Sequence, residues 1–474
     1  MSPIVQLGKE GEMVPPHDIA SVFNAQRVAQ DSSSAASPSK PGAAVDTSSL
    51  GSEQRAVFEQ IESTNQSAFI TGRAGTGKSY LLSFFVANSH KNVVVVAPTG
   101  VAAINIGGQT IHSFFRIPAE TPIDKGRLTI SSAMRNMYRV LDVVVVDEVS
   151  MVSSELMDAI DYILREANDS SLPFGGKQML FFGDLYQLPP VAPPQVMRYL
   201  DDTYGGVYFF HAPGIEALGM ERYELAHIFR QNDPAFIEIL NEVRTGVVTD
   251  DNMSRLNERA IPVPERTEMV VIAPTRAVVE QMNESMLSDI DRPMFTYEAT
   301  VTGDMRETDF PTQRLLHLKV GARVMMLRND VSSSSDRPTE KGRWVNGTIG
   351  EVSKLTDDQV WVMINGVEHQ LDREGWNKYH YSYDPVKKKL DTRTSARFIQ
   401  FPITLAWAVT VHKAQGATYY SVGLNLAGGM FATGQTYVAL SRCVDMNNLY
   451  LSRQIGQDDI KVSNEVSAYM GHAS

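Results

Sequence analysis

Short apolar runs alternate with helical patterns along most of this chain. The runs fall at residues 68–70, 93–96, 143–146, 179–182 and 270–272, and they are rich in β-branched or aromatic residues. They do not alternate apolar with polar positions, which is typical of strands buried on both faces of a parallel sheet. The pattern therefore predicts an α/β fold.

The helices between these runs carry start and stop signals. Ser153 or Ser154 can cap a helix at its N-terminus. The apolar stripe of that helix would contain Leu156, Met157, Ile160, Ile163 and Leu164. Asp233 and Pro234 open another helix, which Gly246 would end, and its apolar face would contain Phe236, Leu240 and Val243.

Two segments interrupt this alternation. Residues 344–352 and 359–371 are strand-like, the second contains the hairpin signal Asn365-Gly366, and Ser332–Ser335 marks a loop. We therefore expect a small β domain at 301–395, inserted into the α/β framework. A second, shorter irregular insert is expected at about 116–139.

The N-terminal segment has a different composition. Residues 31–49 are mostly Ser, Ala, Pro and Gly, with Val45 as the only larger aliphatic residue, so we expect residues 1–49 to form a disordered tail. Residues 1–30 lack the pattern of a secretory signal. The sequence contains no apolar run of about 18 residues, so we do not expect a membrane as a partner. The single cysteine, Cys443, fits an intracellular protein of the cytoplasm, nucleoid or nucleus, not a secreted one.

Composition narrows the classes of protein further. The chain has 474 residues, of which 43% are hydrophobic and 21% charged, as in a soluble globular protein of about three domains. Its net charge of −12 argues against a protein that coats nucleic acid by bulk positive charge. Simple solubility also explains an acidic balance.

Residues 72–79 read GRAGTGKS, the pattern of a phosphate-binding loop. Gly72, Gly75 and Gly77 let the backbone curl so that its N–H groups point at phosphate oxygens. Lys78 can reach the β- and γ-phosphates, and the Ser79 hydroxyl can bind Mg²⁺. The alternative is a glycine turn beside a surface lysine, but a strand before the loop and a helix after it favour nucleotide binding.

An acidic pair follows the four valines at 143–146. Asp147 would hold Mg²⁺ through water, and Glu148 would orient and polarise the attacking water. A solvated acidic turn is the alternative for this pair. Gln187 follows the run at 179–182 and could sense the γ-phosphate, although an ordinary proline-rich loop would look the same.

The order of the motifs resembles superfamily-one DNA helicases, most closely the petite-integration-frequency (PIF) helicase family. The resemblance runs from about Leu50 to about Ser452. Besides the phosphate loop, it is carried by APTGVAAINIGGQTIHSFF (97–115), VVVVDEVSM (143–151), the stretch 154–191 with PFGGKQMLFFGDLYQLPPV, FRQND (229–233), TLAWAVTVHKAQGAT (404–418) and TYVALSRC (436–443).

The resemblance implies an ATP site between two RecA-like lobes. Arg230 and Arg442 would reach the γ-phosphate from the second lobe, where a planar guanidinium suits charge spread over phosphate oxygens. Gln54 resembles the glutamine that reads adenine, although it could be a surface residue, and Gly416 resembles a glycine whose backbone meets the γ-phosphate. The phosphate-loop set would be Gly72, Ala74, Gly75, Thr76, Gly77, Lys78, Ser79 and Tyr80.

The same resemblance implies contacts with single-stranded DNA. Hydroxyls and backbone N–H groups can hold phosphates, and aromatic rings can stack on bases. The candidates are Thr99, Gly100, His112, Ser113 and Phe114 in the first lobe, and Thr410, His412 and Lys413 in the second. For Phe114, a place in the core is an equally good explanation. The β insert would be a Src-homology-three-like barrel near the DNA, and the insert at 116–139 would be the wedge that separates strands.

The expected organisation is a tail at 1–49, a first RecA-like domain at 50–220, a second RecA-like domain at 221–300 and 396–474, and the β insert at 301–395. The resemblance implies an ATP- and Mg²⁺-dependent helicase that moves 5′-to-3′ on single-stranded DNA and unwinds duplex, forked and G-quadruplex DNA. We expect a monomer in solution, with more than one copy on DNA as an option.

Two other functions fit the same residues: a DNA-stimulated translocase that does not separate strands, and a nucleotide-gated DNA-binding module. The pathway stays open among replication, recombination, repair and telomere maintenance. A motor that grips and releases DNA needs a narrow groove and little bulk positive charge, so we expect a shallow salt dependence of DNA binding.

Overall fold

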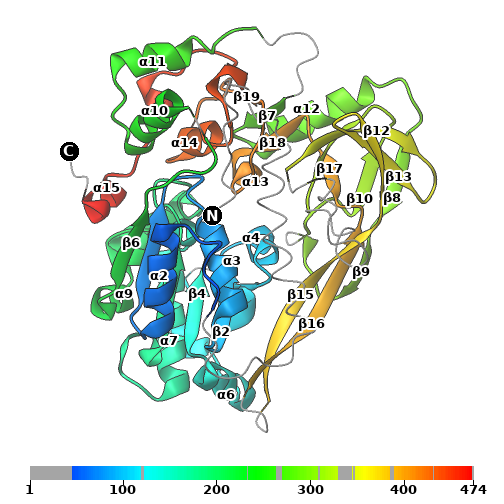
Figure 1. The fold of residues 1–474 in the computed structure, drawn as a ribbon. Helices are drawn as coiled ribbons and strands as arrows, with labels where there is room; N and C mark the ends of the chain where they lie inside the picture. The colour runs from blue at the N-terminus through cyan, green and yellow to red at the C-terminus, as the bar shows by residue number, and fades with distance from the viewer. Residues whose placement is uncertain are drawn as a thin grey trace.

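The structure is a computed structural model that describes residues 45–118, 122–231, 233–262, 269–307, 310–328, 344, 347–384, 389–430 and 432–471. Figure 1 shows two α/β lobes, one above the other, with a region of β-strands beside them. Residues 1–44 of the predicted tail and the predicted loop at Ser332–Ser335 lie outside the described residues. In the described part of the chain, no helix has both the length and the apolar character that crossing a membrane requires.

The first lobe is built on a six-stranded parallel sheet with the order β3-β2-β4-β5-β1-β6. Two runs of four valines pair in register, Val93–Val96 with Val143–Val146, which confirms the predicted central strands. The strands are β1 (Ala68–Gly72), β2 (Val93–Ala97), β3 (Gln109–Thr110), β4 (Val143–Val146), β5 (Gln178–Phe182) and β6 (Glu221–Leu225).

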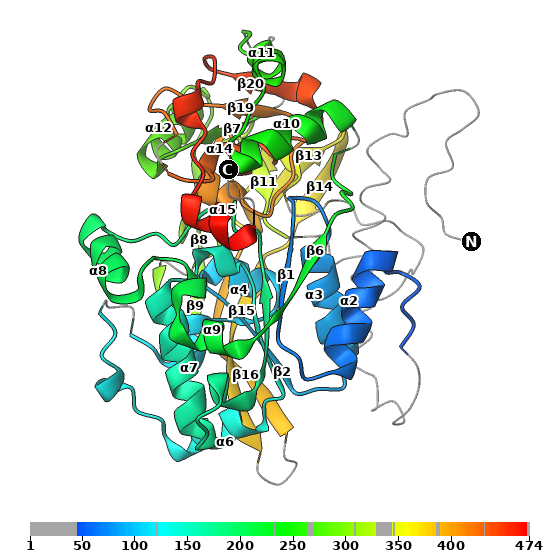
Figure 2. The same cartoon turned by 90° about the vertical axis from the view of Figure 1, so that its left-hand side faces the viewer.

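Helices cover both faces of this sheet (Figure 2). On one face α2 (Ser52–Ser63) and α3 (Lys78–Asn88) bury Phe58 and Phe85, and on the other α7 (Ser154–Asn168) buries its predicted apolar stripe. Of the two predicted caps of α7, Ser153 is the residue whose hydroxyl accepts from Leu156 N. The remaining helices are α4 (Gly100–Asn105), α5 (Ile111–Phe115), α6 (Ser132–Val140), α8 (Pro194–Tyr204) and α9 (Pro213–Leu218).

The second lobe has a four-stranded parallel sheet with the order β18-β7-β19-β20. Asp233 caps α10 (Pro234–Thr245), and Gly246 ends that helix in a left-handed conformation, as predicted. The strands are β7 (Val270–Ala273), β18 (Ala408–Thr410), β19 (Val422–Leu424) and β20 (Leu449–Leu451). The other helices are α11 (Asp250–Asn257), α12 (Arg276–Ser288), α13 (Val411–Ala414) and α14 (Gln435–Leu440).

The β region contains a five-stranded antiparallel sheet with the order β14-β13-β12-β11-β17, a two-stranded sheet β10-β8 and a three-stranded sheet β15-β16-β9. Asn365 and Gly366 form the predicted hairpin, with φ of 50° and 77°. Closure into a barrel stays a prediction. The strands are β8 (Phe295–Glu298), β9 (Thr300–Gly303), β10 (Leu315–Leu318), β11 (Arg323–Met326), β12 (Ile349–Leu355), β13 (Val360–Ile364), β14 (Val367–Leu371), β15 (Glu374–Asp384), β16 (Lys389–Gln400) and β17 (Ile403–Leu405).

Sheet pairing moves the predicted domain boundaries. Strand β6, at 221–225, pairs with β1, so the first lobe extends past the predicted end at residue 220. Strands β8 and β17 pair within the β region, so this region runs from about 295 to 405 and not from 301 to 395. The predicted strand at 344–352 begins at Ile349, where pairing with β11 starts.

Among the described residues, the predicted irregular insert at 116–139 contains a 3-10 turn at Lys125–Arg127 and ends in a helix. Its second half forms α6, because Ser131 caps the helix and Met137 and Tyr138 bury against the core of the first lobe. The long hairpin of β15 and β16 extends from the β region to α6, as the orange ribbons in Figure 1 show. The insert and the β region therefore meet at α6.

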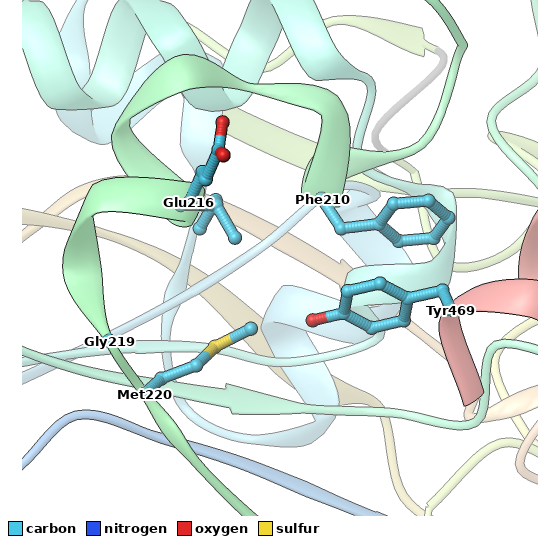
Figure 3. A pocket seen from close by; sticks show the side chains of 6 residues that line it. Phe210, Glu216, Gly219, Met220 and Tyr469 are labelled. Atoms are coloured by element: carbon cyan, nitrogen blue, oxygen red, sulfur yellow. The ribbon is translucent and has the colours of Figure 1, made fainter. Parts of the chain in front are cut away.

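The C-terminal helix α15 (Asn464–Met470) returns to the first lobe. The ring of Tyr469 stacks on Phe210 with a centroid distance of 4.1 Å, and Arg222 Nη1 donates to Met470 O. A cavity of about 360 Å³ lies beside this stack. Figure 3 shows Glu216 and Met220, which line its other walls. The end of the chain thus ties the two lobes together at the side of β6 and α9.

Candidate active site

The phosphate loop connects β1 to α3, as the sequence predicts. Gly75 and Gly77 have φ of 86° and 77°, which favours glycine. Space requires glycine as well, because a Cβ at Gly75 would lie 2.6 Å from Arg230 Cβ, and one at Gly77 would lie 2.5 Å from Gln54 Nε2. Residues of the second lobe and of α2 therefore pack directly against this loop.

Lys78 is folded back onto the loop that precedes it. Its Nζ donates to Gly72 O at 2.6 Å and to Arg73 O at 3.0 Å. Burial lowers the pKa of Lys78, while the carboxylates of Asp184 and Glu148 oppose that shift. The two carbonyl oxygens carry only partial negative charge. A phosphate bound at the loop would therefore form a stronger, charge-assisted hydrogen bond with the Lys78 ammonium group.

The other residues of the predicted phosphate-loop set lie in the same turn. Ala74 N donates to Tyr437 Oη, the Thr76 hydroxyl donates to Arg73 O, and Ser79 is exposed in the first turn of α3. The Tyr80 hydroxyl donates to Ser49 O at 3.4 Å. Tyr80 thus contacts the segment that precedes α2.

Gln54 lies at the rim of the loop. It is 4% exposed; its Oε1 accepts from Gly51 N, and its Nε2 donates to Gly77 O at 3.2 Å. Gln54 is therefore a buried residue at the nucleotide loop, which removes the surface alternative.

Phe229, from FRQND, is a residue that the sequence analysis missed. Its N–H donates to Gly75 O at 2.8 Å, and its ring lies next to Gly77 and Gly51. The side chain is 56% exposed although it sits against the loop. An exposed ring at the rim of a phosphate loop can stack on a purine. An aromatic residue directly before the predicted γ-phosphate arginine was the available signal.

The acidic pair lies at the end of β4. Burial and the neighbouring Glu148 raise the pKa of Asp147 to about 7, and burial raises the pKa of Glu148. Glu148 also has a left-handed backbone, with φ 49° and ψ 44°. Such strain in a residue other than glycine is typical of functional sites.

These donors fit Mg²⁺. The two half-buried carboxylates would gain from a cation that favours their charged forms. Mg²⁺ usually takes one or two protein oxygens and completes its shell with water and phosphate. Among the described residues, no group of three or more His, Cys, Asp or Glu side chains could hold a metal ion without such help. Ser79 and Asp147 remain the candidate ligands.

The two predicted arginines come together in the second lobe. Arg230 Nη1 donates to Ser441 O at 3.3 Å, and Arg442 donates to Val438 O, Ala417 O and Ser441 Oγ. Burial, together with the charge of Arg442, lowers the pKa of Arg230 to about 9. Arg442 is buried and Arg230 is half-buried, and two guanidinium groups that both contact Ser441 favour an anion beside them.

Gln231 and Gln415 are further residues that the sequence analysis missed. Gln231 is 2% exposed, and its Nε2 donates to Ser441 O and Cys443 O, so it holds the segment that carries Arg442. Gln415 Nε2 donates to Glu148 Oε2 at 2.9 Å and to Gln187 Oε1 at 3.2 Å. Both glutamines stand inside quoted motifs, FRQND and HKAQG. The neighbouring Gly416 is exposed, with φ 80°.

A buried polar network joins the lobes behind the loop. Asp184 accepts from Arg244 Nη2 at 3.0 Å and from Tyr437 Oη at 3.1 Å. Burial acts to raise the pKa of Asp184, but the charges of Arg244 and Lys78 lower it overall. The network therefore keeps a carboxylate ionised inside the protein. Residues 184 and 437 are too far apart in the sequence for this contact to be predicted.

The predicted DNA residues occupy three short elements. Thr99 caps α4, where its hydroxyl accepts from Ala102 N, and Gly100 is the first residue of that helix. His112 and Ser113 are half-buried in α5, where burial lowers the pKa of His112. In the second lobe, Thr410 caps α13, and His412 and Lys413 are exposed.

Phe114 takes the alternative position. It is 3% exposed, and its ring packs edge-on against Phe115 and Tyr138 at centroid distances of 4.8 and 5.5 Å. Of the two alternatives that the sequence left open for this ring, the structure therefore shows the core one. The ring anchors α5 to α6.

Comparison with known proteins identifies the family. Residues 49–253 match the family of PIF1-like helicases. The ATP-dependent DNA helicase Pif1 of Bdellovibrio bacteriovorus is 32% identical over 85% of this chain and 87% of its own length. The human ATP-dependent DNA helicase PIF1 is 31% identical over 84% of this chain, which spans 60% of the human protein.

Solved structures agree. Bacteroides Pif1 in complex with ADP-AlF4 superposes with a TM-score of 0.81 at 34% identity, covering 89% of this chain and 96% of that one. The same protein bound to single-stranded DNA superposes with a TM-score of 0.65 over the same shares. The fold is thus that of two RecA-like lobes, and the chain belongs to the PIF1-like helicase family.

Proposed function

We propose that this chain is an ATP-dependent DNA helicase that moves 5′-to-3′ on single-stranded DNA and separates duplex DNA. One observation carries the proposal: Gln415 of the second lobe hydrogen-bonds Glu148 and Gln187 of the first, beside the phosphate loop. Family membership supports ATP and DNA as the substrates. The direction of movement rests on the resemblance alone.

In this proposal the phosphate-loop N–H groups and Lys78 bind the β- and γ-phosphates. Glu148 accepts a proton from the attacking water, and Gln187 helps to orient that water. Arg230 and Arg442 stabilise the charge that develops on the transferred phosphoryl oxygens. Bound Mg²⁺ would neutralise phosphate charge, and the Ser79 hydroxyl and the Asp147 carboxylate are the residues to hold it.

Hydrolysis drives stepping through the two lobes. ATP contacts both lobes and so favours their closed arrangement, while the products favour opening. Thr99, Gly100, His112 and Ser113 on the first lobe, and Thr410, His412 and Lys413 on the second, would hold the strand alternately. The segment before α6 would act as the wedge.

We further propose forked and G-quadruplex DNA as substrates and an intracellular location. One solved Pif1 structure, 34% identical to this chain, concerns unwinding at forked duplex DNA by two coordinating Pif1 helicases. This supports the part of the proposal in which more than one copy acts on the same DNA; the monomer in solution rests on the sequence alone.

The test is ATP hydrolysis with and without single-stranded DNA, followed by strand displacement on forks that carry either a 5′ or a 3′ tail. We expect DNA to stimulate hydrolysis, and displacement to require the 5′ tail. Stimulated hydrolysis without displacement would favour a translocase. DNA binding that responds to ATP without hydrolysis would favour a nucleotide-gated binding module.

A further inference from the structure

The side chain of Gln415 bridges two groups of the first lobe from the second. Its Nε2 donates to Glu148 Oε2 at 2.9 Å and to Gln187 Oε1 at 3.2 Å. A primary amide has two N–H donors, and both are used here. The donors therefore fix the two groups proposed to act on the attacking water relative to each other.

The position of this amide depends on α13. Gln415 is the C-cap of that helix, and its backbone N–H donates to Val411 O at 3.1 Å and to His412 O at 3.3 Å. At the other end, the Thr410 hydroxyl accepts from Lys413 N at 3.2 Å. Because both ends of α13 are capped, we expect the residues of this short helix to move together.

The same helix turns two other side chains toward solvent. His412 and Lys413 are exposed, whereas Val411 and Ala414 are fully buried in the core. A phosphate backbone bound by His412 and Lys413, the two middle residues of this four-residue helix, would shift α13. Gln415, the C-cap of the same helix, would then move against Glu148 and Gln187.

We propose that Gln415 is the positioning residue through which single-stranded DNA at α13 controls the water-activating pair, Glu148 and Gln187. This inference rests on the proposed function, because it requires hydrolysis that DNA stimulates. Gln415 touches neither the nucleotide nor DNA in this proposal. Its contribution is to place two groups, and a misplacement of about 1 Å can cost about a hundredfold in rate.

The alternative is that Gln415 only packs between the lobes. Two substitutions separate these roles. Gln415→Met keeps the length of the side chain but removes both donors, and Gln415→Ala removes the side chain as well. Gln370→Ala is the matched control, since Gln370 also donates to a glutamine, Gln359 Oε1 at 2.6 Å, but is exposed on β14 of the β region.

The experiment measures kcat and KM for ATP with and without oligothymidylate, and the Kd for labelled oligothymidylate by fluorescence anisotropy. In both Gln415 variants, we expect kcat in the presence of DNA to fall about ten- to a hundredfold. The ratio of kcat with DNA to kcat without DNA should therefore approach one. KM and Kd should stay within about twofold of wild type, because neither ligand contacts Gln415.

Three results would overturn the inference: an unchanged kcat ratio in Gln415→Met, an equal fall of kcat with and without DNA, or a loss of DNA affinity that accounts for the whole effect. Thermal unfolding identifies a variant that does not fold. If Gln415→Ala fails to fold, the result for Gln415→Met decides between the two roles, since methionine preserves the volume of the side chain. If the wild-type protein itself shows no stimulation by DNA, the proposed function fails instead.

Discussion

The hydroxyl of Tyr437, in α14 of the second lobe, donates a 3.1 Å hydrogen bond to the buried carboxylate of Asp184 in the first lobe. The same hydroxyl accepts from Ala74 N, in the phosphate loop, at 2.9 Å. One phenolic group thus connects the nucleotide loop of one lobe to a helix of the other. Arg244 binds the same carboxylate and stacks 4.4 Å from the ring of Tyr186.

Removal of this hydroxyl should weaken the junction of the lobes. Tyr437→Phe leaves the Ala74 N–H and one lone pair of Asp184 unpaired in the interior, which costs about 1–3 kcal/mol of folding free energy. We expect a lower midpoint in urea unfolding and a higher KM for ATP, because the loop loses an anchor. Tyr223→Phe, in β6, is the matched control. Equal midpoints for wild type and Tyr437→Phe would contradict the role of the network.

Phe229 should contribute to nucleotide binding. Its exposed ring lies against the phosphate loop, and an aromatic stacking contact is worth about 0.5–1.5 kcal/mol. We therefore expect Phe229→Ala to raise KM for ATP about two- to tenfold with little change in kcat. Phe229→Tyr should behave as wild type, and Tyr420→Ala, which removes another exposed ring, should leave KM unchanged. A fall in kcat at constant KM would place Phe229 elsewhere in the cycle.

The central strands could be predicted because they are buried on both faces. Runs such as the four valines of β4 contain no polar position, which is typical of a strand buried on both faces. The phosphate loop and the Asn365-Gly366 hairpin were equally readable, since each depends on local backbone conformations that favour glycine or asparagine. Strand β6 reads ERYEL and is mostly exposed, so no apolar run marks it. The boundary predicted at residue 220 was wrong for that reason.

The site was predictable only as far as local motifs go. Lys78, Glu148 and Arg442 stand in recognisable blocks, but the sequence does not say which residues of one lobe touch the other. The contacts of Gln415 with Glu148 and of Tyr437 with Asp184 join residues more than 250 positions apart. Phe114 could be a surface or a core residue by sequence, and only the packing of α6 against α5 decided between them.

Acid should weaken the second lobe through Asp459. Two hydrogen bonds from Arg453, each 2.7 Å long, lower the pKa of this carboxyl to about 2, against about 3.9 when unfolded. A lowered pKa means that the stabilisation is complete above pH 4 or so and is lost as pH falls toward 2. We expect Asp459→Asn to lower the urea midpoint at pH 7 and to narrow its difference from wild type at pH 3. A difference that is constant with pH would exclude this titration.

Glu148 should be needed for hydrolysis but not for ATP binding. Glu148→Gln keeps the shape of the side chain but cannot accept a proton, so kcat should fall about 10²–10⁴-fold. Lys78→Ala provides the contrast, because loss of the phosphate-binding cation should abolish turnover and weaken ATP binding together. The measurements are steady-state hydrolysis and binding of a fluorescent ATP analogue. Hydrolysis by Glu148→Gln within a few-fold of wild type would assign the proton transfer to another group, because this substitution removes the proton acceptor and leaves the shape of the side chain unchanged.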